Sequence, residues 1–372
     1  MFRLALQFMN YDKPKTFGAT LGVVVAIFLM GQQAGVFLFL TGLMTALVDN
    51  SKADIWVTND KARDANRLGT LDMRYARELR SIPGVALTAP LLLAGASAKL
   101  KNGEQLPVQL VGAEVPEFLI EPWKVIRGDK YDLLDYGGVS ADMFDLNSID
   151  TLLPGEPLEI NGERAYVRAV TRGARGFGAT LMVTTLSRAR RLGDVPRNKA
   201  SAILLTVADG HDAEQVVETI NRSFYGIRAW TREAFSDQTR QENLSNSGIG
   251  TSTMTLIIFA ILSGMVIIGL TLYSAAIERL NDYATMKAIG ASNGYVTRII
   301  LAQAIIIATV GFGVAVLGLI GFRQGIAGAG VLFDYGWELW TALLIATLVL
   351  AGGGASLAIL RIRKVEPASV FR

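Results

Sequence analysis

Four windows of the sequence contain no Asp, Glu, Lys or Arg, and they constrain the fold more than any other feature. They cover residues 16–48, 243–277, 299–322 and 339–360. Each supplies the roughly 20 apolar residues that a helix needs to cross about 30 Å of hydrocarbon. The pattern therefore predicts four transmembrane helices. It excludes intrinsic disorder and an ordinary cytosolic enzyme, and the absence of Cys excludes a disulfide scaffold and thiolate chemistry.

The first window is interpreted as a retained span rather than a signal peptide. It is much longer than the apolar region of a signal peptide, and it ends at Asp49 without a small-residue cleavage pattern.

The distribution of Lys and Arg predicts the orientation of the spans, because cytoplasmic loops are enriched in these residues. Residues 1–15, 278–298 and 361–372 together hold ten Lys or Arg against four Asp or Glu, whereas the rest of the chain holds 26 against 29. These three segments are expected in the cytoplasm, and residues 49–242 and 323–338 outside. The pI near 9.0 therefore reflects topology, and it does not indicate nucleic-acid binding, because the one large polar segment is slightly acidic.

The N-terminal segment 1–15 is predicted to form a short amphipathic helix at the inner membrane surface, because apolar residues alternate with Arg3 and Gln7 before Pro14. A cytoplasmic extension of the first span is the alternative. Residues 49–242 are long enough for one domain or two small ones. The chain is therefore expected to be an α-helical membrane protein, with a long α+β extracytoplasmic domain between its first and second spans.

Short apolar and β-branched runs between turn residues predict strands in the external domain. These runs are Ala53–Thr58, Leu87–Leu93, Ser97–Lys101, Pro107–Gly112, Leu158–Ile160, Arg164–Val170, Thr180–Thr184 and Ala202–Val207. The clearest hairpin turns at Asn161-Gly162, because this pair readily adopts the positive φ of a two-residue turn. Helices are expected at Met73–Ser81 and at Ala213–Phe224, the second capped by Asp212. A further strand is expected at Gly226–Arg232.

The polar stretch 231–256 passes into the second window without an obvious break. This continuity predicts a helix that rises out of the membrane into the external domain. Ser and Gly gather at Ser245–Ser252, which predicts a bend or fraying there.

No catalytic set is apparent. The single His, His211, lies in an Asp-Gly-His-Asp turn and is predicted to be solvent exposed rather than a metal or haem ligand. The nucleophile-elbow, zinc-protease and Walker A patterns are absent, so the chain is not expected to hydrolyse ATP. A solvated basic face is expected for Arg172, Arg175, Arg188, Arg190 and Arg191. Contact of these arginines with anionic headgroups or a partner is the alternative.

The cytoplasmic loop 278–291 carries residues at helical spacing. Tyr283, Met286 and Lys287 recur at this spacing, and Gly290 is placed to end the helix. A short helix that is apolar on one face and charged at its start is a shape that a rigid partner groove would bind. An ordinary solvated loop fits the spacing alone equally well.

The stretch ERLNDYATMKAIGAS, residues 278–292, resembles the coupling-helix motif of the FtsX/MacB-type ABC permeases, and its centre looks especially like the DevC branch. Residues 361–372 resemble the basic, Arg-ended tail of this family, and residues 29–49 are similar to the end of the first span in DevC. One span, a large external domain and three further spans is also the family's layout. Where the family often has Gly-Ile or Gly-Val, this chain has Ala284-Thr285, a departure from the MacB and lipoprotein-release branches.

The resemblance implies a homodimer in the inner membrane, with two copies of a separate ABC ATPase that bind ATP and Mg on the cytoplasmic side. It implies no cofactor in this chain, an external domain that moves when ATP drives closure, and a periplasmic adaptor and outer-membrane channel as further partners. The ATPase-coupling residues would be Glu278, Arg279, Tyr283, Met286, Lys287, Ala288, Ile289 and Gly290. Of these, Tyr283, Met286 and Ile289 would enter the ATPase groove, and the charged residues would orient the helix at the groove's rim.

Small and polar residues within the spans are further candidates. Gly31 and Gly35 are four residues apart and permit two helices to approach closely, so they are predicted at the dimer seam. Gln32, Gln33 and Gln303 are costly in lipid unless they face protein or water, so they are assigned to the dimer seam or a substrate-facing cleft. An interhelical hydrogen bond is the alternative for these glutamines.

Together these features predict a non-catalytic permease subunit of an ABC exporter, which expels an amphipathic or lipid-like substrate. The alternative is an FtsX-like signalling subunit that controls a periplasmic partner such as a cell-wall hydrolase. A membrane-anchored enzyme is disfavoured because no catalytic set is present.

Overall fold

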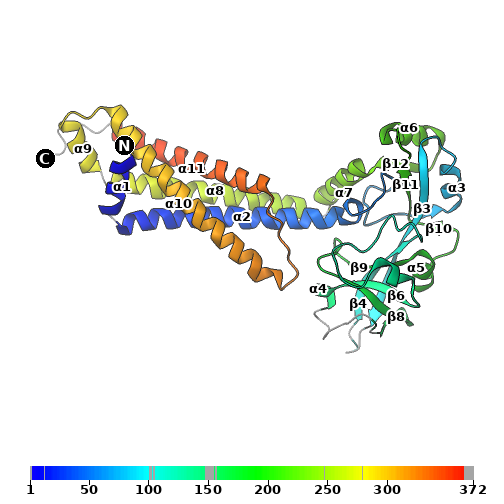
Figure 1. Cartoon of the computed structure of the whole chain (residues 1–372). Coiled ribbons are helices and arrows are strands. Elements are labelled where there is room, and N and C mark those ends of the chain that lie inside the picture. The colour runs from blue at the N-terminus through cyan, green and yellow to red at the C-terminus, as the bar shows by residue number, and fades with distance from the viewer. Residues whose placement is uncertain are drawn as a thin grey trace. The chain divides into compact units, whose positions relative to one another are not determined.

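The computed structural model describes residues 2–11, 13–99, 103, 105–146, 155, 157–246, 248–278 and 280–363. The chain divides into two compact units, each of which is labelled by its elements in Figure 1. The helical unit comprises Met1–Phe39, Thr251–Ala327 and Leu332–Arg372, and the external unit comprises Leu40–Gly250 and Gly328–Val331.

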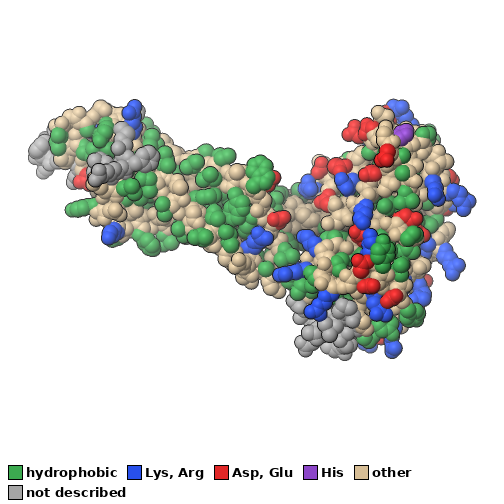
Figure 2. All heavy atoms as spheres, in the orientation of Figure 1, with side chains coloured by type: hydrophobic (Ala, Val, Ile, Leu, Met, Phe, Trp, Pro, Cys, Tyr) green, Lys and Arg blue, Asp and Glu red, His purple; other side chains and the backbone are tan. Residues whose placement is uncertain are grey.

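The helical unit is built from long apolar helices, and a short helix precedes them. Its helices are α1 (Phe2–Tyr11), α2 (Lys13–Asp49), α8 (Ile249–Ile277), α9 (Leu280–Ala288), α10 (Asn293–Ala327) and α11 (Trp337–Arg363). Among the described residues, four stretches are long and apolar enough to cross a membrane: Thr16–Asp49, Gly250–Leu270, Asn293–Ala327 and Trp337–Ser356. The four predicted spans are therefore confirmed as apolar helices, and Figure 2 shows few charged side chains over them.

The external unit includes the last turns of α2 and all of α7 (Arg232–Asn246). Helix α2 is continuous, and its residues belong to the external unit from Leu40 onward. In contrast, the described chain leaves the helical conformation between α7 and α8, where Gly248 has φ +67°. The predicted break near residues 245–252 is confirmed, because a positive φ interrupts the helix at a position where glycine carries no steric cost.

The external unit is an α+β domain around a ten-stranded sheet, as far as the described residues show. The strands are β1 (Ile55–Asn59), β3 (Val85–Lys99), β4 (Gln105–Ala113), β5 (Val125–Arg127), β6 (Gly138–Asp142), β7 (Pro157–Ile160), β8 (Glu163–Thr171), β9 (Thr180–Thr185), β11 (Ala202–Val207) and β12 (Ile227–Thr231). Their order is β12-β1-β11-β3-β7-β8-β5, with β4 joining β3 to β9 and β6 beside β8. A separate pair consists of β2 (Leu71–Asp72) and β10 (Lys199–Ala200).

Short helices cover this sheet on both faces. They are α3 (Arg74–Leu79), the 3₁₀ helix η1 (Lys130–Leu134), α4 (Met143–Leu146), α5 (Leu186–Leu192) and α6 (Ala213–Ser223). Successive strand residues point to opposite faces. Trp56 therefore packs in a cluster with Val48 of α2 and Phe235 of α7, whereas its neighbour Ile55 packs in a cluster with α3 and α6. The Trp56 and Phe235 rings lie 5.6 Å apart, so the ends of α2 and α7 share one apolar core with the sheet.

Each strand and helix that was predicted in the external domain is found, with two runs joined into one strand, whereas β5, β6, α5 and several shorter elements were not predicted. The hairpin of β7 and β8 turns at Asn161 (φ +48°) and Gly162 (φ +85°), and Asp212 caps α6 by accepting a hydrogen bond from the Glu214 amide. The runs 87–93 and 97–101 were predicted as two strands, but the described part forms the single strand β3. Gly95, which reads as a break, continues the ladder opposite Gln109.

Two strand glycines form a matched test of packing in the external unit. A Cβ at Gly112 would lie 2.5 Å from Ala189 Cβ and 3.2 Å from Leu186 Cα, whereas a Cβ at Gly95 would meet nothing within 4 Å. We expect Gly112→Ala to lower the free energy of unfolding by about 1 to 3 kcal/mol, because α5 must move away from the sheet. Gly95→Ala should cause no loss. Urea unfolding followed by tryptophan fluorescence measures both, and equal stabilities of the two variants would contradict this packing.

Candidate functional site

Helix α9 begins the connection between α8 and α10, and its C-terminus is set by a glycine. Gly290 has φ +107°, and the Ala291 amide donates to the Met286 oxygen at 2.9 Å while the Gly290 amide donates to the Lys287 oxygen at 3.0 Å. This pair of bonds is the Schellman motif, which requires the left-handed conformation that glycine adopts without strain. The predicted helix and its stop at Gly290 are confirmed.

Tyr283 faces into the helical unit rather than out of it. Its side chain is 0% exposed, and its hydroxyl donates to Oε1 of Gln303 in α10 at 3.0 Å. We expected Tyr283 in an ATPase groove, and its burial corrects that assignment. A half-polar phenol is most stable where its ring is packed and its hydroxyl is paired. The bond therefore fixes α9 against α10, which is the interhelical role considered for the glutamines.

Other residues of the predicted set are exposed on α9 or directly beside it. Ile289 is 83% exposed, directly after the last turn of the helix. Ala288 and Glu278 are also exposed, and Glu278 accepts a hydrogen bond from the Ser274 hydroxyl at 3.2 Å. Met286 and Lys287 are half-buried. Arg279 lies outside the described residues.

Gly31 and Gly35 lie at close contacts within this chain. A Cβ at Gly31 would lie 2.5 Å from Cδ1 of Leu319 in α10, and a Cβ at Gly35 would lie 2.8 Å from Cε1 of Tyr335. The predicted close contact is found within this chain, where side chains of the same subunit occupy the space that the glycines leave. The neighbouring Gln32 and Gln33 are half-buried.

An aromatic cluster beside Gly35 was not expected from the sequence. The Phe333 and Tyr335 rings lie 5.7 Å apart, and the Tyr335 and Trp340 rings lie 5.0 Å apart. The density of aromatic residues between 333 and 340 could have indicated it, because Tyr and Trp collect at the ends of membrane spans. The cluster packs the connection between α10 and α11 onto α2.

Three of the five arginines that were assigned to a basic face are held by partners within the external unit. The Arg188 guanidinium donates to the backbone oxygens of Leu133 and Asp135 at 2.7 Å each, and burial lowers the pKa of Arg188. Backbone oxygens or acidic side chains also hold Arg175, Arg190 and Arg191. Arg172 is exposed. The basic-face prediction is therefore wrong for Arg175, Arg188 and Arg190, whose charges pair with other parts of the domain. Arg191 is exposed like Arg172, and it forms a surface ion pair with Glu163.

Four residues of the connection between α10 and α11, Gly328–Val331, belong to the external unit. Gly330 has φ +79°, and a Cβ there would lie 2.9 Å from Cβ of Phe144 and 3.0 Å from Nη1 of Arg175. Nη2 of Arg175 is 2.8 Å from Oδ1 of Asp145. Burial raises the pKa of the Asp145 carboxyl, and the Arg175 charge opposes that shift. These residues of the connection therefore lie beside the ion pair of Arg175 and the buried Asp145.

No group of three or more His, Cys, Asp or Glu residues that could hold a metal ion is found in the described part of the chain. His211 lies in an exposed turn before α6, as predicted.

Two family models match the chain. The MacB-like periplasmic core domain matches residues 16–223, which is more than half of the sequence, and the FtsX-like permease C-terminal model matches residues 254–367. The chain belongs to the FtsX/MacB-type ABC permeases. The matches do not distinguish the DevC branch from others. No curated protein sequence matches the chain.

Several solved external domains are similar to this FtsX/MacB-type permease at low identity. The periplasmic region of MacB from Actinobacillus actinomycetemcomitans is 13% identical, with 54% of this chain and 96% of that chain covered and a TM-score of 0.39. The extracellular domain of the ABC-type transporter YknZ from Gram-positive bacteria is 11% identical, with 48% and 99% covered and a TM-score of 0.36. A permease domain from Porphyromonas gingivalis is 14% identical, with 48% and 89% covered and a TM-score of 0.35. The family assignment rests on the two models, because likeness at these TM-scores decides nothing further.

The family assignment indicates where in the cell the protein is located. Four apolar helices and a MacB-like periplasmic core domain describe an inner-membrane protein with a large periplasmic domain. Permeases of this family are generally non-catalytic and work with ABC ATPases, generally as dimers.

The intrachain packing of the permease at Gly31 yields a test. We expect Gly31→Leu to lower the thermal stability of the purified permease, because its side chain must displace Leu319 and Leu343. Gly18→Leu is the matched control in the same helix, since a Cβ at Gly18 meets nothing within 4 Å. Differential scanning fluorimetry in detergent measures both variants at several protein concentrations. A Gly31→Leu variant that melts like the control, or whose loss depends on protein concentration, would support a dimer seam instead.

Proposed function

We propose that this permease is the membrane subunit of an ABC exporter and that α9 binds a separate ATPase, which binds ATP and Mg. ATP-driven movement of α9 then reaches the external unit and expels an amphipathic or lipid-like substrate. A second copy of the permease and of the ATPase complete the machine, and a periplasmic adaptor with an outer-membrane channel would carry the substrate onward.

The observation that carries this proposal is the direct connection of α9 to α10. The Tyr283 hydroxyl holds α9 to Gln303 in the first half of α10. Helix α10 then ends at Ala327, and the next four residues belong to the external unit. A displacement of α9 is therefore passed to one helix whose far end continues into the external unit. Coupling in proteins is carried by such contiguous packed elements when they have two arrangements.

The exposed face of α9 supports an ATPase contact. Ile289 is the large apolar side chain that α9 and its C-terminal turn leave most exposed among the described residues. An exposed aliphatic residue on a cytoplasmic loop gains free energy when a partner removes it from water. Glu278 and Lys287 carry opposite charges at the two ends of the helix, which would orient a partner without adding much affinity.

The first test compares two exposed aliphatic residues. Ile289→Ala should weaken binding of the ATPase to the permease by about tenfold or more, because it truncates an apolar contact residue. Leu317→Ala is the control, since Leu317 is 69% exposed on the apolar surface of α10. Binding is measured by biolayer interferometry with the permease in nanodiscs, in the presence of ATP and Mg. Equal affinities of the two variants would show that this end of α9 is not the ATPase contact.

The second test addresses transmission. Gly330→Ala should reduce substrate-stimulated ATP turnover, because an alanine at φ +79° costs about 1 to 2 kcal/mol and its Cβ crowds Phe144 and Arg175. Gly328→Ala should leave turnover unchanged, because a Cβ there meets nothing within 4 Å. Turnover and substrate movement are measured in proteoliposomes that contain permease and ATPase.

Normal turnover in the Gly330→Ala variant would contradict transmission through this connection. Wild-type complexes that hydrolyse ATP without moving any amphipathic substrate would favour the signalling alternative over export.

A further inference from the structure

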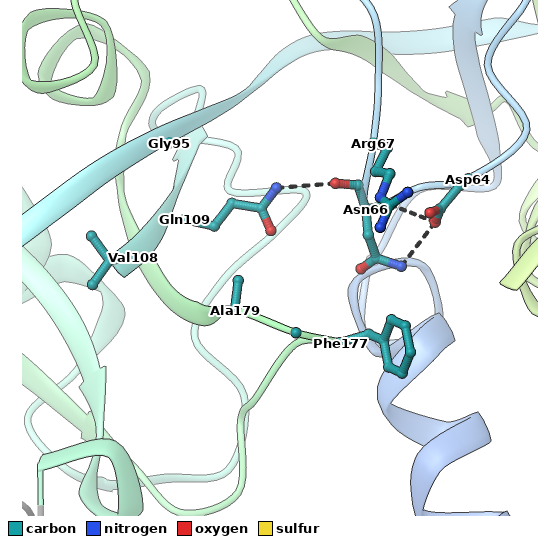
Figure 3. A pocket seen from close by; sticks show the side chains of 9 residues that line it. Asp64, Asn66, Arg67, Gly95, Val108, Gln109, Phe177 and Ala179 are labelled. Carbon is teal, nitrogen blue, oxygen red and sulfur yellow. Dashed lines mark hydrogen bonds between the residues drawn. The ribbon is translucent and has the colours of Figure 1, made fainter. Parts of the chain in front are cut away.

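The external unit contains a cavity of about 320 Å³ to which the family assignment gives no role. The residues that line it include Asp64, Asn66, Arg67, Gly95, Gln109 and Phe177, which Figure 3 shows as sticks. The volume lies at the lower end of the range of small-molecule sites. The cavity therefore fits a compact group rather than a large hydrophobic ligand.

One wall of the cavity is a strand position that carries no side chain. Gly95 of β3 lies directly opposite Gln109 of β4, and its backbone conformation is one that any residue adopts in a strand. A Cβ at Gly95 would nevertheless meet nothing within 4 Å. The open space above this glycine is part of the cavity, so a larger residue at position 95 would fill it without disturbing the strand.

Two side-chain amides at the cavity are held in one orientation. Nδ2 of Asn66 donates to the Met44 oxygen at 2.8 Å and to Oδ1 of Asp64 at 2.9 Å, and Nε2 of Gln109 donates to the Asn66 backbone oxygen at 3.2 Å. All three acceptors require an N–H donor, so neither amide can be reversed. In Figure 3 both amide oxygens point away from these bonds; the Asn66 oxygen lies above the ring of Phe177, and the Gln109 oxygen points toward Ala179. The cavity therefore presents two fixed acceptors.

The charges at the cavity have opposite signs. Asp64 is 8% exposed, and its Oδ1 also accepts from the backbone N–H of Asn66 at 2.9 Å. Its second oxygen has no hydrogen-bond partner in the described part of the chain. Arg67 is exposed, and its guanidinium forms no ion pair with any residue that the structure describes. The two amide oxygens and the carboxylate favour a cationic donor, whereas Arg67 favours an anion beside it.

We propose that this cavity binds a small zwitterionic group that carries a primary ammonium and a phosphate or carboxylate. The ammonium donates its N–H groups to the oxygens of Asn66 and Gln109, near the negative charge of Asp64 and the face of Phe177. The anionic group pairs with Arg67. A quaternary ammonium is a poorer ligand, because it has no N–H to donate and one aromatic ring does not enclose it.

Two sources share this chemistry. One is the headgroup of an aminophospholipid, and the other is a free amine that bears a phosphate or carboxylate. Asn66 bonds to Met44, and Met44 belongs to the apolar span Thr16–Asp49. The Asn66 bond therefore attaches the site to the helix that forms the first span. It is tested on the permease alone, without ATPase or nucleotide, so its failure is independent of the coupling proposal.

The ligand series tests the chemistry. Isothermal titration of the full-length permease in detergent compares glycerophosphoethanolamine with glycerophosphocholine and with glycerol 3-phosphate. We expect the ethanolamine compound to bind at least about tenfold more tightly than either of the others, because only it supplies ammonium N–H donors. Equal affinities of the ethanolamine and choline compounds, or no binding of the ethanolamine compound, would overturn the proposal.

Variants of the lining residues test whether the ligand binds in this cavity. Gly95→Leu should abolish binding by filling the cavity, and Ala86→Leu is the control at an exposed position of the same strand. Gln109→Met keeps the length of the side chain but removes one acceptor, so it should weaken binding at least about tenfold. Arg67→Gln should weaken the binding of glycerophosphoethanolamine more than that of plain ethanolamine. Unchanged binding in the Gln109→Met and Gly95→Leu variants would overturn the site.

Measurements in nanodiscs distinguish a lipid headgroup from a free ligand as the bound group. Hydrogen–deuterium exchange of residues 64–67 and 105–113 is compared in phosphatidylethanolamine and phosphatidylcholine nanodiscs, with and without added glycerophosphoethanolamine. Protection in phosphatidylethanolamine alone supports the lipid headgroup, and protection that requires the soluble compound supports a free ligand. Absence of protection under every condition would overturn the proposal.

Discussion

A backbone in hydrocarbon must pair its own N–H and C=O groups, and this requirement determines the helical unit. Once the uncharged windows form helices, the distance at which these helices pack against one another still has to be determined by their side chains. Leu319 and Leu343 crowd the position of Gly31, and Tyr335 crowds that of Gly35, so α2 contacts α10 and α11 where its side chains are smallest. In lipid no hydrophobic force draws helices together, so such close packing is the main favourable contact available.

Sequence patterns predicted the spans, the β7–β8 hairpin and helix α6, because each depends on residues that are adjacent in the chain. A charge-free window, an Asn-Gly turn and an Asp cap act locally. The strand β6 was missed because it is short and pairs in parallel with β8, so its support comes from distant residues. The single strand β3 was split for the opposite reason: Gly95 is a local break signal that pairing with β4 overrides.

The element that carries the site residues was predicted, but the directions in which their side chains point were not. Helix α9 and its glycine stop follow from spacing, yet nothing local indicates that Tyr283 turns inward to Gln303, twenty residues further on. The close contact at Gly31 follows from its size, but the partner does not, because one chain and a second copy offer the same small-residue signal. Arg188 shows the same limit, since its backbone partners lie some fifty residues earlier in the chain.

Helix α2 gives the cavity in the external unit a physical connection to the first span. The Asn66 amide donates both to Asp64, beside the cavity, and to the carbonyl oxygen of Met44 in α2. An ammonium bound at the Asn66 oxygen polarises the same amide and strengthens its N–H bonds, because donation and acceptance by one amide are cooperative. Met44 is fully buried, so its carbonyl has no water to replace a lost Asn66 bond. Occupancy of the cavity therefore stabilises the attachment of this loop to α2, and any movement of α2 that stretches the bond weakens the ligand in return. That reciprocity is what linkage requires of two events that share one hydrogen-bonded group.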